Sequence, residues 1–297
     1  FFTISVILIL LVPVGMGVFH AKDGKALNYS LEFMGGTSTN VTFNDDMSID
    51  DLDSQVKPVV QEVTGDANIQ ISKVADSNAV IIKTRSLSLD EREELNQKLV
   101  DSFGVDDSKI TAESISSTVS SEMRRDAIVA VLIATICMLL YIWFRFKDVR
   151  FATSAVLALL HDVLVVLAFY AVSRISVGGT FIACMLTIVG YSINATIVIF
   201  DRIREELPLM KRNTDLSELV NKCITQTLTR SIYTSLTTFI MVAVLFIMGV
   251  SSIREFAAPL MVGIVCGGYS SVCVTGALWY VMKTKVGKKA QPKKKKK

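Results

Sequence analysis

The chain has 297 residues, of which 51% are hydrophobic, and a formal net charge of +3. This apolar fraction exceeds what a soluble core of that length needs, so the composition favours a membrane protein over a soluble globular one. Most acidic residues lie between Asp23 and Asp126 or between Asp201 and Glu218. Polar and lipid-embedded parts are therefore expected to alternate along the chain.

The first element is an apolar run over residues 1–20. Neither an initiator methionine nor a basic leader precedes it, so we interpret it as a first transmembrane helix truncated at its start. A signal peptide is the alternative, although no A-x-A-like cleavage site stands out. A sequence that opens inside a span can also continue a longer polypeptide.

Residues 21–125 predict a small extracytoplasmic domain in which strand and helix signals alternate. Strands are expected at 38–43, 67–74, 79–84 and 109–114, and helices at 49–63 and 89–103. Ser48 with Asp51, and Ser88 with Glu91, have the spacing of helix N-caps. The resulting order, β-α-β-β-α-β, predicts an α+β fold of the ferredoxin-like type.

Residues 126–282 predict the rest of a helical membrane domain. A helix needs about 20 apolar residues to cross the hydrocarbon core. Five further stretches meet this length approximately: 127–144, 151–172, 181–200, 231–250 and 257–282. The sequence therefore predicts an α-helical polytopic membrane protein with six transmembrane helices.

Basic residues set the expected orientation. The connection over 145–150, the pair Lys211 and Arg212, and the tail over 283–297 are rich in lysine or arginine, which accumulate on the cytoplasmic side. The domain over 21–125 should then face outward. The tail predicts attraction to anionic lipid headgroups, with RNA binding as the less favoured alternative.

Cysteine and histidine usage argues against metal and disulfide chemistry. The five cysteines lie outside the polar domain and show no CxxC spacing, and the chain holds two histidines. A pairing of nucleophile and base, or a phosphate-binding glycine loop, is likewise not recognisable. Gly35 and Gly36 precede a strand and are interpreted as a turn. The sequence thus predicts neither an enzyme nor a cofactor or metal.

Ionisable residues inside apolar spans are the main functional signal, because a charge at mid-bilayer costs about 2.5 to 3.5 kcal/mol. His161 and Asp162 interrupt the span over 151–172. Proton or ion exchange and a structural hydrogen bond to a neighbouring helix are both open for Asp162. Asn194, in the next span, should need a partner on another helix.

The span over 231–250 follows a stripe of polar residues: Thr227, Arg230, Thr234 and Thr237. Such a stripe suits either a hydrated path or a close helix contact. Pairing at the cytoplasmic interface explains Asp201, Arg202 and Arg204. Gly263 and Gly267 have a small-xxx-small spacing, which predicts close packing against another helix.

Several segments together resemble the SecD/SecF family, which is related to the resistance-nodulation-division (RND) exporters. The resemblance covers nearly the whole chain, and the tyrosine-serine forms favour the SecF branch. Its segments, in order, are residues 31–37 (LEFMGGT), 117–128, 160–162 (LHD), 190–194 (GYSIN), 200–205 (FDRIRE), 227–231 (TLTRS) and 263–271 (GIVCGGYSS).

The resemblance implies an accessory subunit of Sec protein export in the bacterial cytoplasmic membrane. It implies SecD, separate or fused, and the SecYEG channel as partners, with YajC and YidC as further candidates and lipid and unfolded exported polypeptide as contacts. Nucleic acid is not expected. Proton movement through the membrane helices would drive the outer domain.

One position departs from the family pattern. Ala195 stands where the family's span has the aspartate assigned to proton relay. The proton-relay candidates in this chain are Asp162, Arg230, Asn194 and Thr234, and SecD would supply the missing carboxylate. Two alternatives stay open: half of an RND exporter of small molecules or lipids, and a structural SecD partner without a relay of its own.

Overall fold

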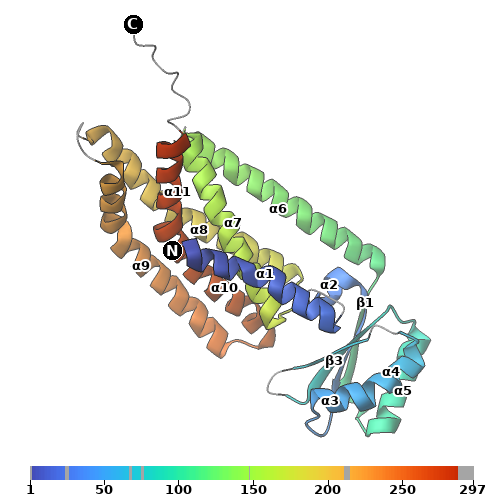
Figure 1. Cartoon of the computed structure of the whole chain (residues 1–297). Helices are drawn as coiled ribbons and strands as arrows, with labels where there is room; N and C mark the ends of the chain where they lie inside the picture. Colours follow the sequence, from blue (N-terminus) through green and yellow to red (C-terminus); the bar gives the residue numbers. More distant parts are fainter. Residues whose placement is uncertain are drawn as a thin grey trace. The chain divides into compact units, whose positions relative to one another are not determined.

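The computed structural model describes residues 2–23, 27–66, 69–74, 77–146, 148–210 and 215–286. It separates into two compact units, one formed by Tyr29–Val129 and the other by Phe1–Asn28 with Ala130–Lys297. Figure 1 gives the order of the elements. Lys211, Arg212 and the lysine-rich segment 287–297, on which part of the predicted orientation depends, lie outside the described residues.

The Tyr29–Val129 unit has the predicted ferredoxin-like order. Its four strands form an antiparallel sheet in the order β2-β3-β1-β4. The elements in sequence are α2 (Leu31–Met34), β1 (Gly36–Thr42), α3 (Ile49–Asp51), the π-helical η1 (Leu52–Val56), α4 (Lys57–Thr64), β2 (Gln70–Lys73), β3 (Ala79–Thr84), α5 (Leu89–Phe103), the 3₁₀ turn η2 (Asp107–Lys109) and β4 (Ile110–Ile115).

One hydrophobic core holds this unit together. Alternate strand residues such as Val80 and Ile82 are buried, as the period of two in a strand requires. They pack against apolar residues of the helices, among them Val60, Leu95 and Leu99. The helices therefore pack against the sheet through this core, and the predicted α+β fold is confirmed.

Gly35 and Gly36 join α2 to β1 at the position of the predicted turn: Gly35 caps α2 and Gly36 is the first residue of β1. Both have a positive φ, +70° and +115° respectively, which side chains rarely adopt. A side chain at Gly36 would also collide with the carbonyl oxygen of Thr84 on the neighbouring strand. The two glycines are thus required by the backbone, independently of any ligand.

Both predicted helix caps are capping boxes. The hydroxyl of Ser48 accepts from the amide of Asp51, and that of Ser88 from the amide of Glu91. The Glu91 carboxylate accepts in return from the Ser88 amide at 2.8 Å and pairs with Arg85. The hydrogen bond from Arg85, followed by those from Ser88, lowers the pKa of Glu91 to about 2.

Acid should loosen the start of α5. Because the folded pKa of Glu91 lies below its ordinary value of 4.5, its contribution to stability is present above about pH 4.5 and is lost as the pH falls towards 2. We expect Glu91→Gln to speed hydrogen exchange in the first turns of α5 at pH 6 and to differ much less from the wild type near pH 2.5. Glu94→Gln, at an exposed position of α5, is the control. An equal difference at both pH values would contradict this.

The other unit is a bundle of long apolar helices. Five are long and apolar enough to span a membrane, and the shorter apolar helix Thr3–Val18 lies within α1. The elements are α1 (Phe2–Asp23), the part of α6 (Ser117–Phe146) from Ala130 onward, α7 (Val149–Ser173), α8 (Gly179–Glu206), η3 (Leu207–Leu209), α9 (Leu216–Met248), α10 (Ser251–Tyr269), the π-helical η4 (Ser270–Thr275), α11 (Gly276–Val281) and η5 (Met282–Val286). The chain is a multi-pass membrane protein; the predicted count of six spans stays a prediction.

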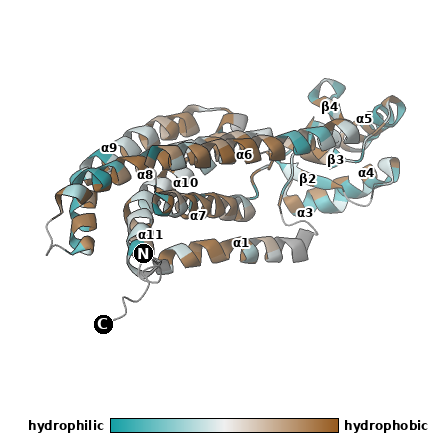
Figure 2. Ribbon diagram, turned by 90° about the horizontal axis from the view of Figure 1, so that it is seen from above, coloured by the Kyte–Doolittle hydropathy of each residue, from teal (hydrophilic) through white to brown (hydrophobic). Residues whose placement is uncertain are grey.

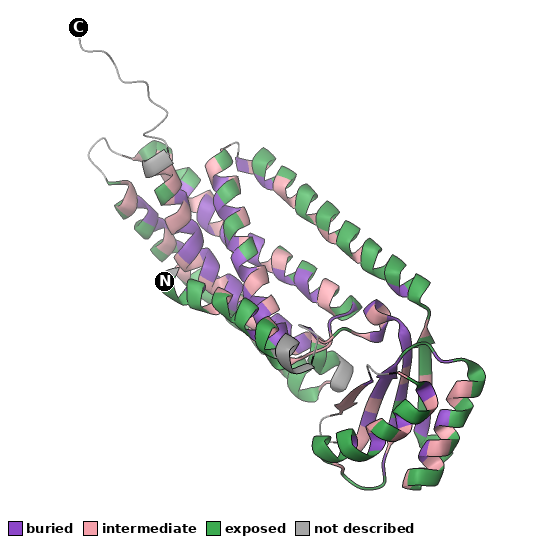
Figure 3. Cartoon of the chain, turned by 45° about the vertical axis from the view of Figure 1, so that its right-hand side comes forward, coloured by how far each residue is buried: buried purple, intermediate pink, exposed green. Residues whose placement is uncertain are grey.

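Burial differs sharply among these helices. In α7 half of the most apolar window is buried, whereas in α6 and α9 only 6% is. Figure 2 shows that α1, α6 and α7 carry mostly hydrophobic residues, and Figure 3 shows α6 exposed along almost its whole length. Exposed apolar surface of this kind suits contact with lipid or with other membrane helices.

Glycine lets α10 approach α8. A Cβ atom at Gly263 would overlap the side chain of the fully buried Ile188, and one at Gly267 would lie 3.2 Å from the Cβ of Ser192. Small residues permit such contacts between membrane helices. The predicted close packing of this segment is confirmed.

Candidate functional site

Asp162 is the centre of a buried polar network in the helix bundle. It lies on α7 and is 1% exposed. One carboxylate oxygen, Oδ2, accepts hydrogen bonds from the hydroxyls of Ser192 on α8 at 2.5 Å and of Ser270 in η4 at 2.7 Å. The other, Oδ1, lies 3.2 Å from the thiol of Cys266 on α10. Three helical segments thus converge on a single carboxylate.

His161 completes this network from the same helix. Its Nδ1 lies 2.9 Å from Oδ1 of Asp162, and the ring is buried. An imidazole can donate or accept at this nitrogen, and a carboxyl group can accept or, once protonated, donate. Both protonation states of Asp162 therefore have a hydrogen-bonded arrangement with His161.

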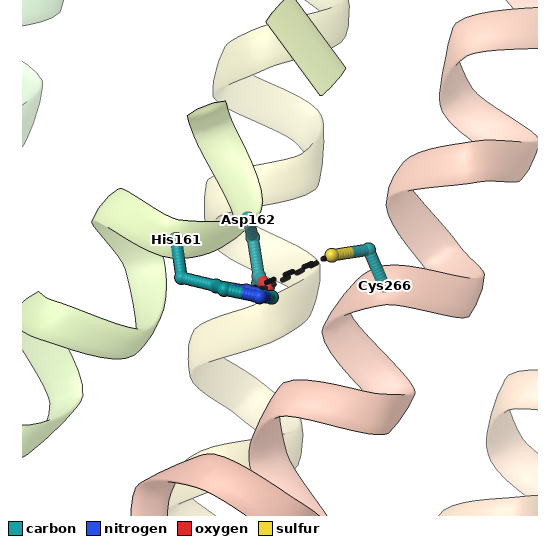
Figure 4. Close-up of side chains that lie close together, drawn as sticks. All are labelled: His161, Asp162 and Cys266. Atoms are coloured by element: carbon teal, nitrogen blue, oxygen red, sulfur yellow. Dashed lines mark hydrogen bonds and ion pairs between the residues drawn. The ribbon is translucent and has the colours of Figure 1, made fainter. Parts of the chain in front are cut away.

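Figure 4 shows the side chains of His161, Asp162 and Cys266 directed towards one another. Their ligand atoms all lie within 4.8 Å of each other, a spacing that also suits a metal ion. The two serine hydroxyls already occupy Oδ2, which leaves Oδ1 as the carboxylate atom facing the imidazole and the thiol. That the chain binds no metal stays a prediction.

The backbone next to the network is irregular. Ser270 opens η4, in which the hydroxyl of Thr275 donates to the carbonyl of Ser270, five residues earlier, at 3.0 Å. Single turns of π-helix occur mostly as local bulges, often at functional positions. Here the π-helical turn begins at Ser270, whose hydroxyl donates a hydrogen bond to Asp162.

The remaining relay candidates line a separate pocket of about 100 Å³ between α8 and α9. It contains Asn194, Arg230 and Thr234 together with Ala195, whereas Asp162 does not line it. The complete lining is Tyr191, Asn194, Ala195, Val198, Arg230, Ser231, Thr234 and Ser235. The four candidates therefore lie in two separate places. Asp162 is a buried carboxylate, whereas Asn194, Arg230 and Thr234 line the pocket.

One expectation about this pocket is not met, and the neighbouring threonine stripe of α9 has a local explanation. Asn194 is exposed, and its side chain forms no hydrogen bond to another helix within the described residues, so the expected interhelical partner is not found. The threonine hydroxyls of α9 mostly serve their own helix, since Thr234 donates to the carbonyl of Arg230 at 2.8 Å and Thr237 to that of Tyr233 at 2.9 Å. The stripe is therefore not a continuous chain of free hydroxyls.

The predicted interfacial residues are paired. Asp201 accepts from Arg145 on α6 at 2.8 Å. Arg202 binds Glu206 at 2.7 Å and Gln226 on α9 at 2.7 Å, and Arg204 donates to the carbonyl of Arg145 at 3.0 Å. These contacts tie α6, α8 and α9 together at one end and account for the three residues structurally.

Sequence reasoning missed three partners of Asp162. Ser192 and Ser270 stand in segments that carry the family resemblance, and Cys266 lies between the two small residues of the glycine segment. The available signal was their spacing: Cys266 and Ser270, four residues apart, share one helical face. Which face meets α7 depends on tertiary packing.

Comparison with known proteins identifies the family to which this sequence belongs. Residues 95–285 match the model of the family described as protein export membrane protein SecD/SecF, C-terminal. That segment includes Asp162 and all its partners. The chain belongs to the SecD/SecF family.

The relatives include proteins named SecF and proteins named SecDF. The protein translocase subunit SecF of Alicyclobacillus acidocaldarius is 35% identical over 89% of this chain and 85% of its own length. The protein translocase subunit SecDF of Thermus thermophilus is 35% identical over 95% of this chain but only 37% of its own length. The chain thus corresponds to most of a separate SecF subunit and to about a third of a SecDF protein.

A solved structure supports the fold. The crystal structure of SecDF from Thermus thermophilus, a translocon-associated membrane protein, superimposes with a TM-score of 0.80 at 34% identity, over 95% of this chain and 37% of that chain. A second structure, of SecDF in a super-membrane-facing form, gives a TM-score of 0.64 over 96% of this chain and 38% of that one. The fold is therefore that of the matched part of SecDF.

Proposed function

We propose that the chain is an accessory subunit of bacterial Sec protein export, acting with SecD and SecYEG in the cytoplasmic membrane and using the proton motive force. The names of its relatives support the export role, and the SecDF proteins support SecD as its partner. The outer domain would hold or release the exported polypeptide. We further propose that the chain moves substrate without catalysing a covalent reaction or binding a cofactor.

The buried carboxylate of Asp162 is the observation that carries the proton-coupled part of this proposal. A carboxylate inside a membrane helix is expensive unless it is paired or has a role. Asp162 has hydrogen-bond partners from α8, α10 and η4. A change in its protonation would alter contacts to all three segments, which couples proton binding to helix packing.

Co-purification tests the partners. When the tagged full chain is expressed in its native membrane and extracted in mild detergent, SecD and SecYEG should elute with it. An exporter of small molecules would be recovered without them. Recovery of the intact chain without SecD and SecYEG would contradict the proposal.

Ala195 bears on the source of the relay carboxylate. Its methyl group lines the pocket beside Arg230, at the position where the family resemblance implies an aspartate. We propose that SecD supplies a carboxylate to the coupled system, while Asp162 and Arg230 have supporting roles. A structural SecD partner without a relay of its own is the second candidate, and Ala195 is the observation that favours it.

Ala195→Asp should change how strongly export depends on the proton motive force. The new carboxylate would lie in the pocket with Arg230 and could bind and release a proton, which alanine cannot. Export into reconstituted vesicles, measured across a series of imposed proton gradients, should then respond to the gradient with a different slope. Ala195→Asn is the uncharged control of equal size. Identical slopes for both variants would argue against a relay role at this position.

A further inference from the structure

The geometry of the pocket between α8 and α9 points to a binding site for a small monovalent inorganic anion of the halide class. The site is formed by Asn194, Arg230, Ser231 and Ser235, with Ala195 as part of its wall. This inference concerns the isolated chain. It goes beyond the export role and does not depend on it.

Arg230 supplies the charge. Its guanidinium is always protonated and can donate five hydrogen bonds. Within the described residues it has no ion-pair or hydrogen-bond partner for its side chain, and no acidic residue lines the pocket. Arg230 is exposed on α9, and an anion bound in the pocket would neutralise its charge.

Ser231 supplies an independent sign of a missing partner. The residue is 7% exposed, and its Oγ is a buried hydroxyl oxygen for which the described residues offer no hydrogen-bond partner. Buried hydroxyls are nearly always satisfied in folded proteins. An acceptor bound in the pocket that Ser231 lines would satisfy it.

Two further donors face the same space. The hydroxyl of Tyr191 donates to Oγ of Ser235 at 2.8 Å, which leaves the proton of Ser235 available for another acceptor. The exposed Asn194 adds an amide group with two donor hydrogens. By contrast, the proton of Thr234 is already used by the carbonyl of Arg230. Cation, hydroxyls and amide together favour an anion over a cation.

Charge favours a monovalent anion, and the pocket has room for a halide ion. Its volume of about 100 Å³ is enough for such an ion together with water. A single arginine balances one negative charge. The methyl group of Ala195 leaves this space open, whereas a carboxylate there would neutralise Arg230 from within the chain.

Binding of radioactive chloride to the purified full chain in detergent tests the inference. We expect saturable binding that bromide displaces and gluconate does not. Arg230→Gln should weaken it at least tenfold and Ser231→Ala severalfold. Thr238→Val, on the same helix but outside the pocket lining, is the control and should bind as the wild type does. Wild-type protein without saturable binding would overturn the site.

Two substitutions at residue 195 separate the effect of charge on chloride binding from the effect of side-chain volume. They test the inference even if Arg230→Gln does not fold. Ala195→Asp and Ala195→Asn add side chains of nearly equal size, but only aspartate is negative. Chloride affinity should fall at least fivefold further in Ala195→Asp than in Ala195→Asn. Equal affinities would overturn the inference. SecD and translocation take no part in this assay, so its outcome is independent of the export proposal.

Discussion

Asp162→Asn should reduce the stimulation of export by a proton gradient at least tenfold. The variant chain should still fold. Asparagine fills the same volume and can exchange hydrogen bonds with Ser192 and Ser270, whose hydroxyls both donate and accept. It cannot take up or release a proton. Loss of hydrogen bonds that the carboxyl oxygens accept should reduce the free energy of unfolding by about 1 to 3 kcal/mol.

Reconstituted vesicles containing SecD and SecYEG provide the measurement, with and without an imposed gradient. Ser192→Ala is the matched control, because it removes one hydrogen bond to Asp162 but leaves the carboxylate. We expect it to destabilise the chain by about 1 kcal/mol and to keep most of the gradient-dependent stimulation. If Asp162→Asn responded to the gradient as the wild type does, Asp162 would be a structural residue only.

The second large effect concerns the contact between α8 and α10. Gly263→Ala should destabilise the bundle by about 1 to 3 kcal/mol, because the added methyl group overlaps Ile188 in a packed interior. Gly190→Ala, on α8, is the matched control, since nothing lies within 4 Å of a Cβ at that position. There the higher helix propensity of alanine should be neutral or stabilising by up to about 1 kcal/mol. Thermal unfolding of the purified variants in one detergent measures the difference.

Ile188→Ala tests whether a clash with Ile188 is the cause of the destabilisation by Gly263→Ala. Alone it should destabilise the chain by about 2 to 5 kcal/mol, because it leaves a cavity at a fully buried position. In the Gly263→Ala background the same change should be much less harmful, since the two substitutions compensate in volume. Strictly additive effects would contradict a direct clash between these residues.

Much of the fold could be predicted from local sequence alone. The capping boxes at Ser48 and Ser88 are local signals, and both helices begin where they indicate. Gly35 and Gly36, at the junction of α2 and β1, are predictable because the backbone there needs a positive φ. Strand β2 covers Gln70–Lys73 of the expected 67–74; Ile69 and Val74 lie outside it because a strand's ends depend on pairing with its neighbour, here β3, and residues 67 and 68 lie outside the described residues.

The site was predictable only in part. Its charged members stand out in apolar spans, which is why Asp162 and Arg230 were found. Their grouping was not predictable, because residues such as Ser192 and Asn194, two positions apart on α8, face different neighbours: one bonds Asp162 and the other lines the pocket. Serines in membrane helices are common, and their partners follow from helix packing that local sequence does not specify.

Export into membrane vesicles depleted of this chain tests the central claim most directly. Purified chain is added back with SecD, and the completion of translocation is followed before and after an ionophore collapses the proton gradient. The account predicts that the chain restores completion only while the gradient is present. Equal restoration after the gradient has collapsed, or none at all in its presence, would contradict it.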